Sequence, residues 1–155
     1  MGGWERTFVM IYTEMTKKAL KLCFEAHRDQ VDRGGMPYVF HPFHLAEQME
    51  DELTVTVALL HDVVEDGGFT LSDLRDMGFP QEVTDAVGLL TREKGIPYME
   101  YVAKIRENET AKRVKLADLA HNSDQTRLSG DDGIPKERKE AWKKKYSQAK
   151  QLLEG

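Results

Sequence analysis

The stretch LTVTVALLHDVVED, residues 53–66, decides the fold class of this chain. Its apolar residues fall on nearly every face of a helix over 53–65, which is the pattern of a helix buried on most sides. In the segments around it, apolar residues recur at spacings of three and four, and no segment shows the sustained alternation of a strand. The sequence therefore predicts an all-α fold, a compact bundle of about seven to eight helices packed around this central one.

Capping residues, prolines and glycines set the expected bounds of the other helices. Thr13 or Thr16 opens the first helix, and the glycines at 34 and 35 end that segment. Its expected core face consists of Ala19, Leu20, Cys23, Phe24 and His27. Thr70 and Asp73 form a variant of the capping box in front of a short helix. The remaining helices are expected at residues 43–50, 80–91, 97–107 and 110–125 and from residue 135 onward.

The length and composition are those of one soluble domain. The 155 residues fit a single domain, which we expect over residues 13–155 after an N-terminal tail, residues 1–12. The longest run without a charged residue, 34–46, is shorter than the roughly 18 residues that a membrane span needs. The lone cysteine, Cys23, is expected to be a buried thiol in a reducing compartment, which predicts a cytoplasmic protein with no membrane partner.

The net charge of −5 argues against nucleic acid as a partner, because nucleic-acid binding needs a basic face. The charge is uneven, since residues 136–150 carry seven Lys or Arg and only two Glu. Two interpretations stay open for this basic terminal helix: a solvated helix face on an acidic protein, or a surface that meets an anionic partner. The oligomeric state is not predicted by any of these patterns.

Four ionisable residues close the central segment: His61, Asp62, Glu65 and Asp66. In a helix, residues three and four apart share a surface, so these side chains are expected to face one site. Carboxylates at the C-terminal end of a helix oppose its dipole, which costs roughly 0.3 to 1 kcal/mol for each exposed anion. A divalent cation would compensate that cost, and a mixed imidazole and carboxylate set suits Mn, Fe, Co or Zn better than Ca.

Two residues elsewhere in the chain are candidates for the same site. In the segment 110–125, Asp118 falls on the inward face with Val114 and Asn122. A buried aspartate needs a partner, and either a metal ion or a salt bridge to Lys or Arg would satisfy it. His41 is held by the proline that follows it, and a helix cap or a core histidine is there the alternative to a metal ligand.

Three blocks of sequence resemble the hydrolase domain of the RelA/SpoT family: GMPYVFHP at 35–42, ALLHDVVED at 58–66, and VKLAD at 114–118 with Asn122. The order His41, His61-Asp62, Asp118 resembles the metal-binding signature of the HD superfamily of phosphohydrolases. The resemblance covers roughly residues 16–125 and implies a compact HD-domain helical bundle. It further implies a metal-dependent enzyme that removes the 3′-pyrophosphate of the nucleotide (p)ppGpp, giving GDP or GTP and pyrophosphate.

The same resemblance implies a role for each matched residue. Four residues are implied to bind one divalent ion, Mn²⁺ in that family: His41, His61, Asp62 and Asp118. Glu65 and Asp66 match the catalytic acidic pair, which orients the attacking water or moves its proton, and Asn122 matches an asparagine that contacts the substrate. Two further substrate contacts are expected: Arg33 as a cation for phosphate or base, and Tyr38 as a ring that stacks on a base. The alternatives are an ordinary solvated arginine and a core tyrosine.

Two departures from the family pattern bear on the substrate. Asp32 stands where many members have a basic residue, and Leu119 stands where arginine is frequent, so we expect weaker or altered nucleotide recognition with the metal chemistry intact. Two alternatives therefore stay open: an HD-type hydrolase of another nucleotide, and a non-enzymatic metal or nucleotide sensor. The remaining histidines are interpreted as structural: His27, His44 and His121.

Overall fold

The computed structural model describes residues 9–128 and 133–155. These residues form eight α-helices: α1 (Glu14–His27), α2 (Phe40–Glu47), α3 (Glu52–Leu60), α4 (Leu71–Asp76), α5 (Gln81–Leu89), α6 (Tyr98–Ile105), α7 (Glu109–Asn122) and α8 (Lys136–Glu154). A short 3-10 helix, η1 (Gln125–Leu128), follows α7. Within the described residues there is no strand beyond an isolated bridge between Val31 and Pro37, so the predicted all-α fold is confirmed.

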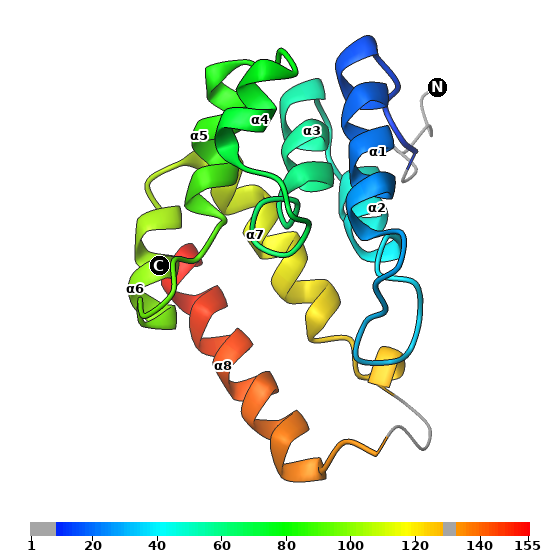
Figure 1. Ribbon diagram of the computed structural model, residues 1–155. Helices are drawn as coiled ribbons and strands as arrows, with labels where there is room; N and C mark the ends of the chain where they lie inside the picture. The colour runs from blue at the N-terminus through cyan, green and yellow to red at the C-terminus, as the bar shows by residue number, and fades with distance from the viewer. Residues whose placement is uncertain (1–8, 129–132) are drawn as a thin grey trace, which may run out of the picture.

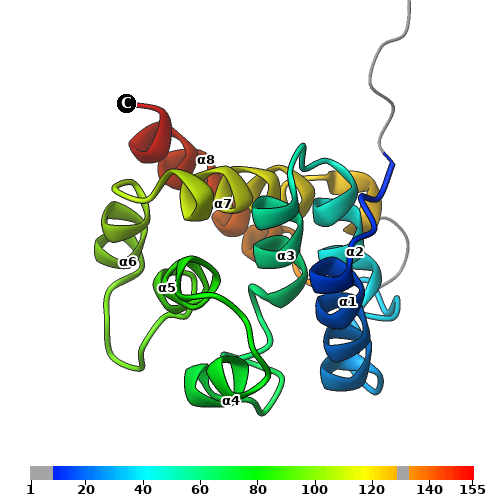
Figure 2. The same cartoon turned by 90° about the horizontal axis from the view of Figure 1, so that it is seen from above.

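Helix α3 lies at the centre of the bundle, as Figure 1 and Figure 2 show. It packs against α1, α2, α5 and α7, and α7 packs in turn against α6 and α8. Every residue from Val55 to Leu60 is fully buried, because apolar side chains on all faces of the helix are covered by its neighbours. The prediction of a central helix buried on most sides is confirmed.

Local sequence explains where the helices start. Thr13 precedes α1 and Thr70 precedes α4, and each makes both hydrogen bonds of a capping box. The box at Thr70 uses Asp73, as the sequence predicts. Helices α5, α6 and α8 each begin directly after a proline, whose fixed φ suits the entry to a helix.

Several expected helix bounds were wrong, including the ends of α2 at Glu47 and of α7 at Asn122, each three residues earlier than expected. Helix α1 ends at His27, before the expected glycines, and Phe24, expected in the core, is 56% exposed. Helix α2 begins at Phe40, earlier than expected, because Pro42 fits within the first turn, where the N–H that it lacks would have no partner in the helix. Helix α3 ends at Leu60, which changes how the residues after it reach the site.

Residues 1–8 of the predicted N-terminal tail lie outside the described residues. Met10, which belongs to the same predicted tail, is buried in the core. The domain boundary at residue 13 therefore stays a prediction. In the described part of the chain, no helix combines the length and the apolar character that crossing a membrane requires.

Cys23 lies in α1 with none of its surface exposed. Burial, helped by the nearby charge of Asp62, raises its pKa to about 12. Because the thiolate is the reactive form of cysteine, the native protein should resist iodoacetamide at pH 8 and should react fully only when it is unfolded in guanidinium. Mass spectrometry of the treated protein measures the extent of alkylation. Labelling of the native protein at the rate of a free thiol would contradict the burial of Cys23.

Candidate active site

The residues that follow α3, residues 61–66, form a series of turns rather than a continuation of the helix. His61 caps α3, and the N–H of Asp66 donates to the carbonyl oxygen of Asp62 at 2.9 Å. A longer helix would have set more carboxylates against the negative end of its dipole, and Gly68, with φ of +81°, lets the chain turn away. The expectation that the helix continues through residue 65 was wrong. Oxygen atoms of Asp62, Glu65 and Asp66 nevertheless lie within 4.8 Å of one another.

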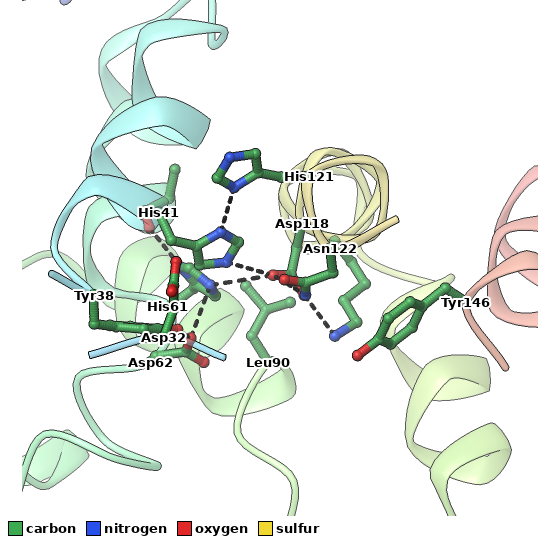
Figure 3. A network of polar contacts seen from close by, with 12 residues as sticks. Asp32, Tyr38, His41, His61, Asp62, Leu90, Asp118, His121, Asn122 and Tyr146 are labelled. Carbon is green, nitrogen blue, oxygen red and sulfur yellow. Dashed lines mark hydrogen bonds and ion pairs between the residues drawn. The ribbon is translucent and has the colours of Figure 1, made fainter. Parts of the chain in front are cut away.

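The turns after α3 open into a cavity of about 340 Å³. All nine residues for which the sequence predicts a site role line this cavity: Arg33, Tyr38, His41, His61, Asp62, Glu65, Asp66, Asp118 and Asn122. Figure 3 shows the side chains of His41, His61 and Asp118 converging on one another. The fold thus brings together residues from three separate parts of the chain: the loop before α2 together with the first turn of α2, the turns after α3, and α7.

His61 has one ring nitrogen engaged and one without a hydrogen bond. Its Nδ1 lies 2.6 Å from the carbonyl oxygen of Ala58, and since a carbonyl only accepts, Nδ1 carries a proton. Its buried Nε2 makes no hydrogen bond and lies 3.1 Å from Asp62 Oδ2 and 3.7 Å from Asp118 Oδ1. Burial lowers the pKa of His61, but the two carboxylates outweigh burial and raise it well above its usual value. A positive charge is therefore favoured at Nε2 of His61, and either a proton or a metal ion would supply it.

The donor atoms around His61 fit a divalent metal ion. One donor atom each from His41, His61 and Asp62 lies within 4.8 Å of the other two, and Asp118 Oδ1 is 2.8 Å from His41 Nε2. Imidazole and carboxylate together are ligands for transition metals such as Mn, Fe, Co and Zn. Metal-binding histidines usually donate one ring N–H to a group such as a backbone carbonyl. This hydrogen bond fixes the tautomer and leaves the lone pair of the other ring nitrogen for the metal ion.

His41, in the first turn of α2, is positioned by a second histidine (Figure 3). Its Nδ1 lies 2.7 Å from Nδ1 of His121, and the two rings stack with their centroids 4.9 Å apart. Burial and the positive charge of Arg127 lower the pKa of His121 to about 3, so this ring stays neutral. One proton therefore lies in the hydrogen bond between the Nδ1 atoms of His41 and His121. His121, interpreted from the sequence as structural, thus orients the ring of His41.

Asp118 meets both kinds of partner that the sequence left open. Its Oδ2 accepts from Lys115 Nζ at 2.8 Å, whereas its Oδ1 faces His41 and accepts from Asn122 Nδ2 at 3.1 Å. Burial raises the pKa of Asp118, but Lys115 and the histidines outweigh it and hold the pKa well below its usual range. The sequence analysis missed Lys115, although a lysine three residues before an inward-facing aspartate on one helix is the signal for such a pair.

Replacing Lys115 with methionine should destabilise the metal-free protein by about 3 kcal/mol, because a buried carboxylate loses its cation. Denaturant unfolding in the presence of EDTA measures this loss. Added Mn²⁺ should recover part of it, because a ligand that binds only the folded state stabilises that state. The control is Lys104→Met, which removes an exposed lysine from α6 and should change stability little. Equal stability of the two variants would mean that the Lys115–Asp118 pair contributes nothing.

The acidic residues of the cavity have separate supports. The hydroxyl of Tyr38 donates to Asp62 Oδ2, and Glu65 Oε1 accepts from the backbone N–H of Arg92 at 2.7 Å. Burial, followed by the charge of Asp62, raises the pKa of both Glu65 and Asp66. A carboxylate whose pKa is raised is a better proton acceptor, so this pair suits proton transfer. Tyr38 lines the cavity as expected, but its hydroxyl holds a candidate metal ligand.

Asp32, a departure from the family pattern, is paired within the protein. Its Oδ1 accepts from the backbone N–H groups of Gly34 and Met36 at 2.8 and 3.0 Å, and its Oδ2 accepts from Arg127 Nη2 at 3.0 Å. Burial raises its pKa, but these hydrogen bonds outweigh burial and lower it. Arg127 lines the same cavity and neutralises the negative charge of Asp32, so the expectation of weaker or altered nucleotide recognition stays a prediction.

Arg33 joins the loop before α2 to the last helix. Its Nη1 donates to the hydroxyl of Tyr146 at 2.8 Å, and its guanidinium group lies 3.6 Å from the centre of the Trp142 ring. Tyr146 and Lys145, both on α8, line the cavity as well. The sequence analysis singled out none of these three residues of α8, although it marked this helix as basic.

An all-α bundle that gathers two histidines and two aspartates around one point of a cavity defines an HD-domain protein. No model of a known protein family matches the chain. The guanosine-3′,5′-bis(diphosphate) 3′-pyrophosphohydrolase MESH1 of Danio rerio is 32% identical over 123 residues, which cover 71% of this chain and 68% of that protein. The Xenopus tropicalis MESH1 is 33% identical over 118 residues, or 68% of this chain and 65% of that protein. The chain belongs to the RelA/SpoT-type hydrolase family that includes these MESH1 proteins.

The fold agrees with this membership. A solved structure, described as a metazoan ortholog of SpoT that hydrolyses ppGpp, superposes with a TM-score of 0.72 at 25% identity, covering 94% of this chain and 95% of that one. A GTP pyrophosphokinase of Brucella melitensis is 32% identical over 123 residues, 70% of this chain. The chain spans only 16% of that protein and between 12% and 16% of the other long relatives of this kind.

Proposed function

We propose that this protein is a metal-dependent hydrolase that removes the 3′-pyrophosphate of (p)ppGpp and releases pyrophosphate with GDP or GTP. The observation that carries the proposal is the convergence of all nine predicted site residues on one cavity. The choice of substrate is supported by the similarity to the MESH1 proteins, whose name states this activity.

Four residues are proposed to hold one divalent ion, with Mn²⁺ as that ion: His41, His61, Asp62 and Asp118. The free Nε2 of His61, which lies between two carboxylate oxygens, supports this ligand set. When bound, such an ion supplies a Lewis acid for the phosphoryl group and lowers the pKa of water. Tyr38 and His121 hold Asp62 and His41 in orientation through the hydrogen bonds described above.

Glu65 and Asp66 are proposed to orient the attacking water and to accept its proton. Their raised pKa values support this role, because a stronger base takes a proton from water more readily. The backbone N–H of Arg92 engages one oxygen of Glu65, which fixes the direction of the carboxylate. Correct orientation of a water molecule toward phosphorus contributes to the rate by itself.

The substrate in this proposal is a small nucleotide that Asn122, Arg33 and Tyr38 contact. Arg33 presents a cation to phosphate or base, and Asn122 presents an amide beside the proposed ligand Asp118. We propose a cytoplasmic protein with neither nucleic acid nor membrane as a partner, and the net charge of −5 supports the exclusion of nucleic acid.

The test incubates the purified, Mn²⁺-loaded protein with ppGpp, pppGpp, GTP, GMP and a cyclic dinucleotide. Chromatography of the nucleotides and an assay for pyrophosphate should show release of pyrophosphate from ppGpp and pppGpp only. Chelation of the metal with EDTA should stop the release. Hydrolysis of only a different nucleotide would show that this nucleotide, and not (p)ppGpp, is the substrate. Binding of a nucleotide without hydrolysis would indicate a sensor.

A further inference from the structure

A group of cations lies on the side of the cavity that α8 forms. Arg33 and Lys145 line the cavity there, and the charges of Arg92 and Lys115 are close enough to influence Lys145. Lys115 is paired with Asp118. Among the described residues, neither Arg33 nor Lys145 has a carboxylate within ion-pair distance. This side of the cavity therefore carries positive charge that the protein itself does not neutralise.

Lys145 is the clearest member of this group. Its side chain is half-buried, and its Nζ lies 4.2 Å from the centre of the Tyr98 ring. Burial, and after it the charges of Arg92, Arg33 and Lys115, lowers the pKa of its ammonium group. An ammonium group that is partly desolvated and surrounded by other cations is costly unless an anion binds beside it. The aromatic ring offsets only part of that cost.

Arg33 is held in a fixed position beside this lysine. The Trp142 ring stacks on its guanidinium group, and the Tyr146 hydroxyl accepts one of its five N–H donors. Its remaining donors are available to a ligand, and a planar guanidinium group matches two oxygens of a phosphate at once. The partners of Arg33, Trp142 and Tyr146, flank Lys145 in the sequence of α8. Arg33 and Lys145 therefore form one positive surface.

We propose that Arg33 and Lys145 bind a second phosphate group of the substrate, distinct from the group that reacts beside His61. This inference rests on the proposed function, because a guanosine nucleotide with diphosphates on both the 3′ and the 5′ oxygen carries two anionic ends. The 3′ end meets the histidine and aspartate cluster, and the 5′ diphosphate meets α8. The basic character of α8 then serves substrate recognition, and a nucleotide without 5′ phosphates is a poorer substrate.

The first measurement is the steady-state hydrolysis of ppGpp by Lys145→Met. KM should rise about tenfold, because one charge-assisted contact to phosphate is lost, whereas kcat should stay within twofold because Lys145 does not touch the reacting phosphorus. The difference in KM should shrink as salt is raised. The matched control is Lys144→Met, which removes the same charge from the neighbouring, exposed residue of α8 and should leave KM within twofold. Arg33→Met should raise KM in the same way, which covers the case that Lys145→Met does not fold.

The second measurement separates this inference from the proposed function. Calorimetric titration of GDP into the protein without added metal reports on the 5′-diphosphate alone. Wild type and Lys144→Met should bind GDP alike, and Lys145→Met should bind it about tenfold more weakly. Unchanged GDP affinity and unchanged KM in both the Lys145 and the Arg33 variant would overturn the inference, even if ppGpp is hydrolysed, and so would the absence of GDP binding by wild type. Loss of GDP binding in Lys145→Met without any hydrolysis of ppGpp by wild type would leave the phosphate site standing and would refute the proposed substrate.

Discussion

Replacement of His61 with alanine should reduce the metal content from about one divalent ion per chain to nearly none and should lower turnover of ppGpp by at least about a hundredfold. The physical reason is the position of this residue. The Nε2 of His61 is buried between oxygens of Asp62 and Asp118, and without it the proposed ligand set would keep only one imidazole, that of His41. Inductively coupled plasma mass spectrometry of the dialysed protein measures the metal.

The control for this experiment is His44→Ala. His44 is exposed and its ring lies tilted against that of His121 with the centroids 4.3 Å apart, but it does not line the cavity. The His44 variant should therefore keep its metal and most of its turnover. Equal metal content in the His61 variant and in wild type would show that the metal site has been assigned to the wrong residues.

The double substitution Glu65→Gln with Asp66→Asn should keep the fold and the metal and should lower kcat by about a hundredfold to ten-thousandfold. An amide keeps the shape of the carboxylate and can still accept the hydrogen bond from the N–H of Arg92, but it cannot take a proton from water. Circular dichroism, metal analysis and the rate of pyrophosphate release measure the three quantities separately.

The matched control for the acidic pair is Glu82→Gln with Asp85→Asn, two exposed residues on α5 outside the cavity. This variant removes the same two charges and should retain full turnover. If the Glu65 and Asp66 variant loses its metal, the pair would act as ligands instead of bases. If it loses nothing, neither residue takes part in the reaction.

The amino-acid sequence by itself determined the fold class and the main parts of the candidate site. Helical periodicity, the buried run before His61 and the capping box at Thr70 are local signals, because each arises from residues within one or two turns of helix. Ionisable groups at the end of a buried helix need a partner, and this reason singled out His61, Asp62, Glu65 and Asp66. The assignment of His41 and Asp118 to the same site rested on the resemblance to the RelA/SpoT family. Sequence alone overestimated the length of α3, because its apolar pattern continues in Val63 and Val64 after the backbone has left the helix.

Only the tertiary structure decided which distant groups meet. The pair Asp32–Arg127 joins residues 95 positions apart, and the contact between Arg33 and Tyr146 joins residues 113 positions apart. Periodicity describes which face of a helix is apolar, but the partner on that face depends on how all the helices pack, and the polar partners follow from that packing. For this reason the sequence analysis saw in Asp32 only the replacement of a basic residue and left the role of the basic helix α8 open. In the packed chain, Asp32 pairs with Arg127, and residues of α8 line the cavity.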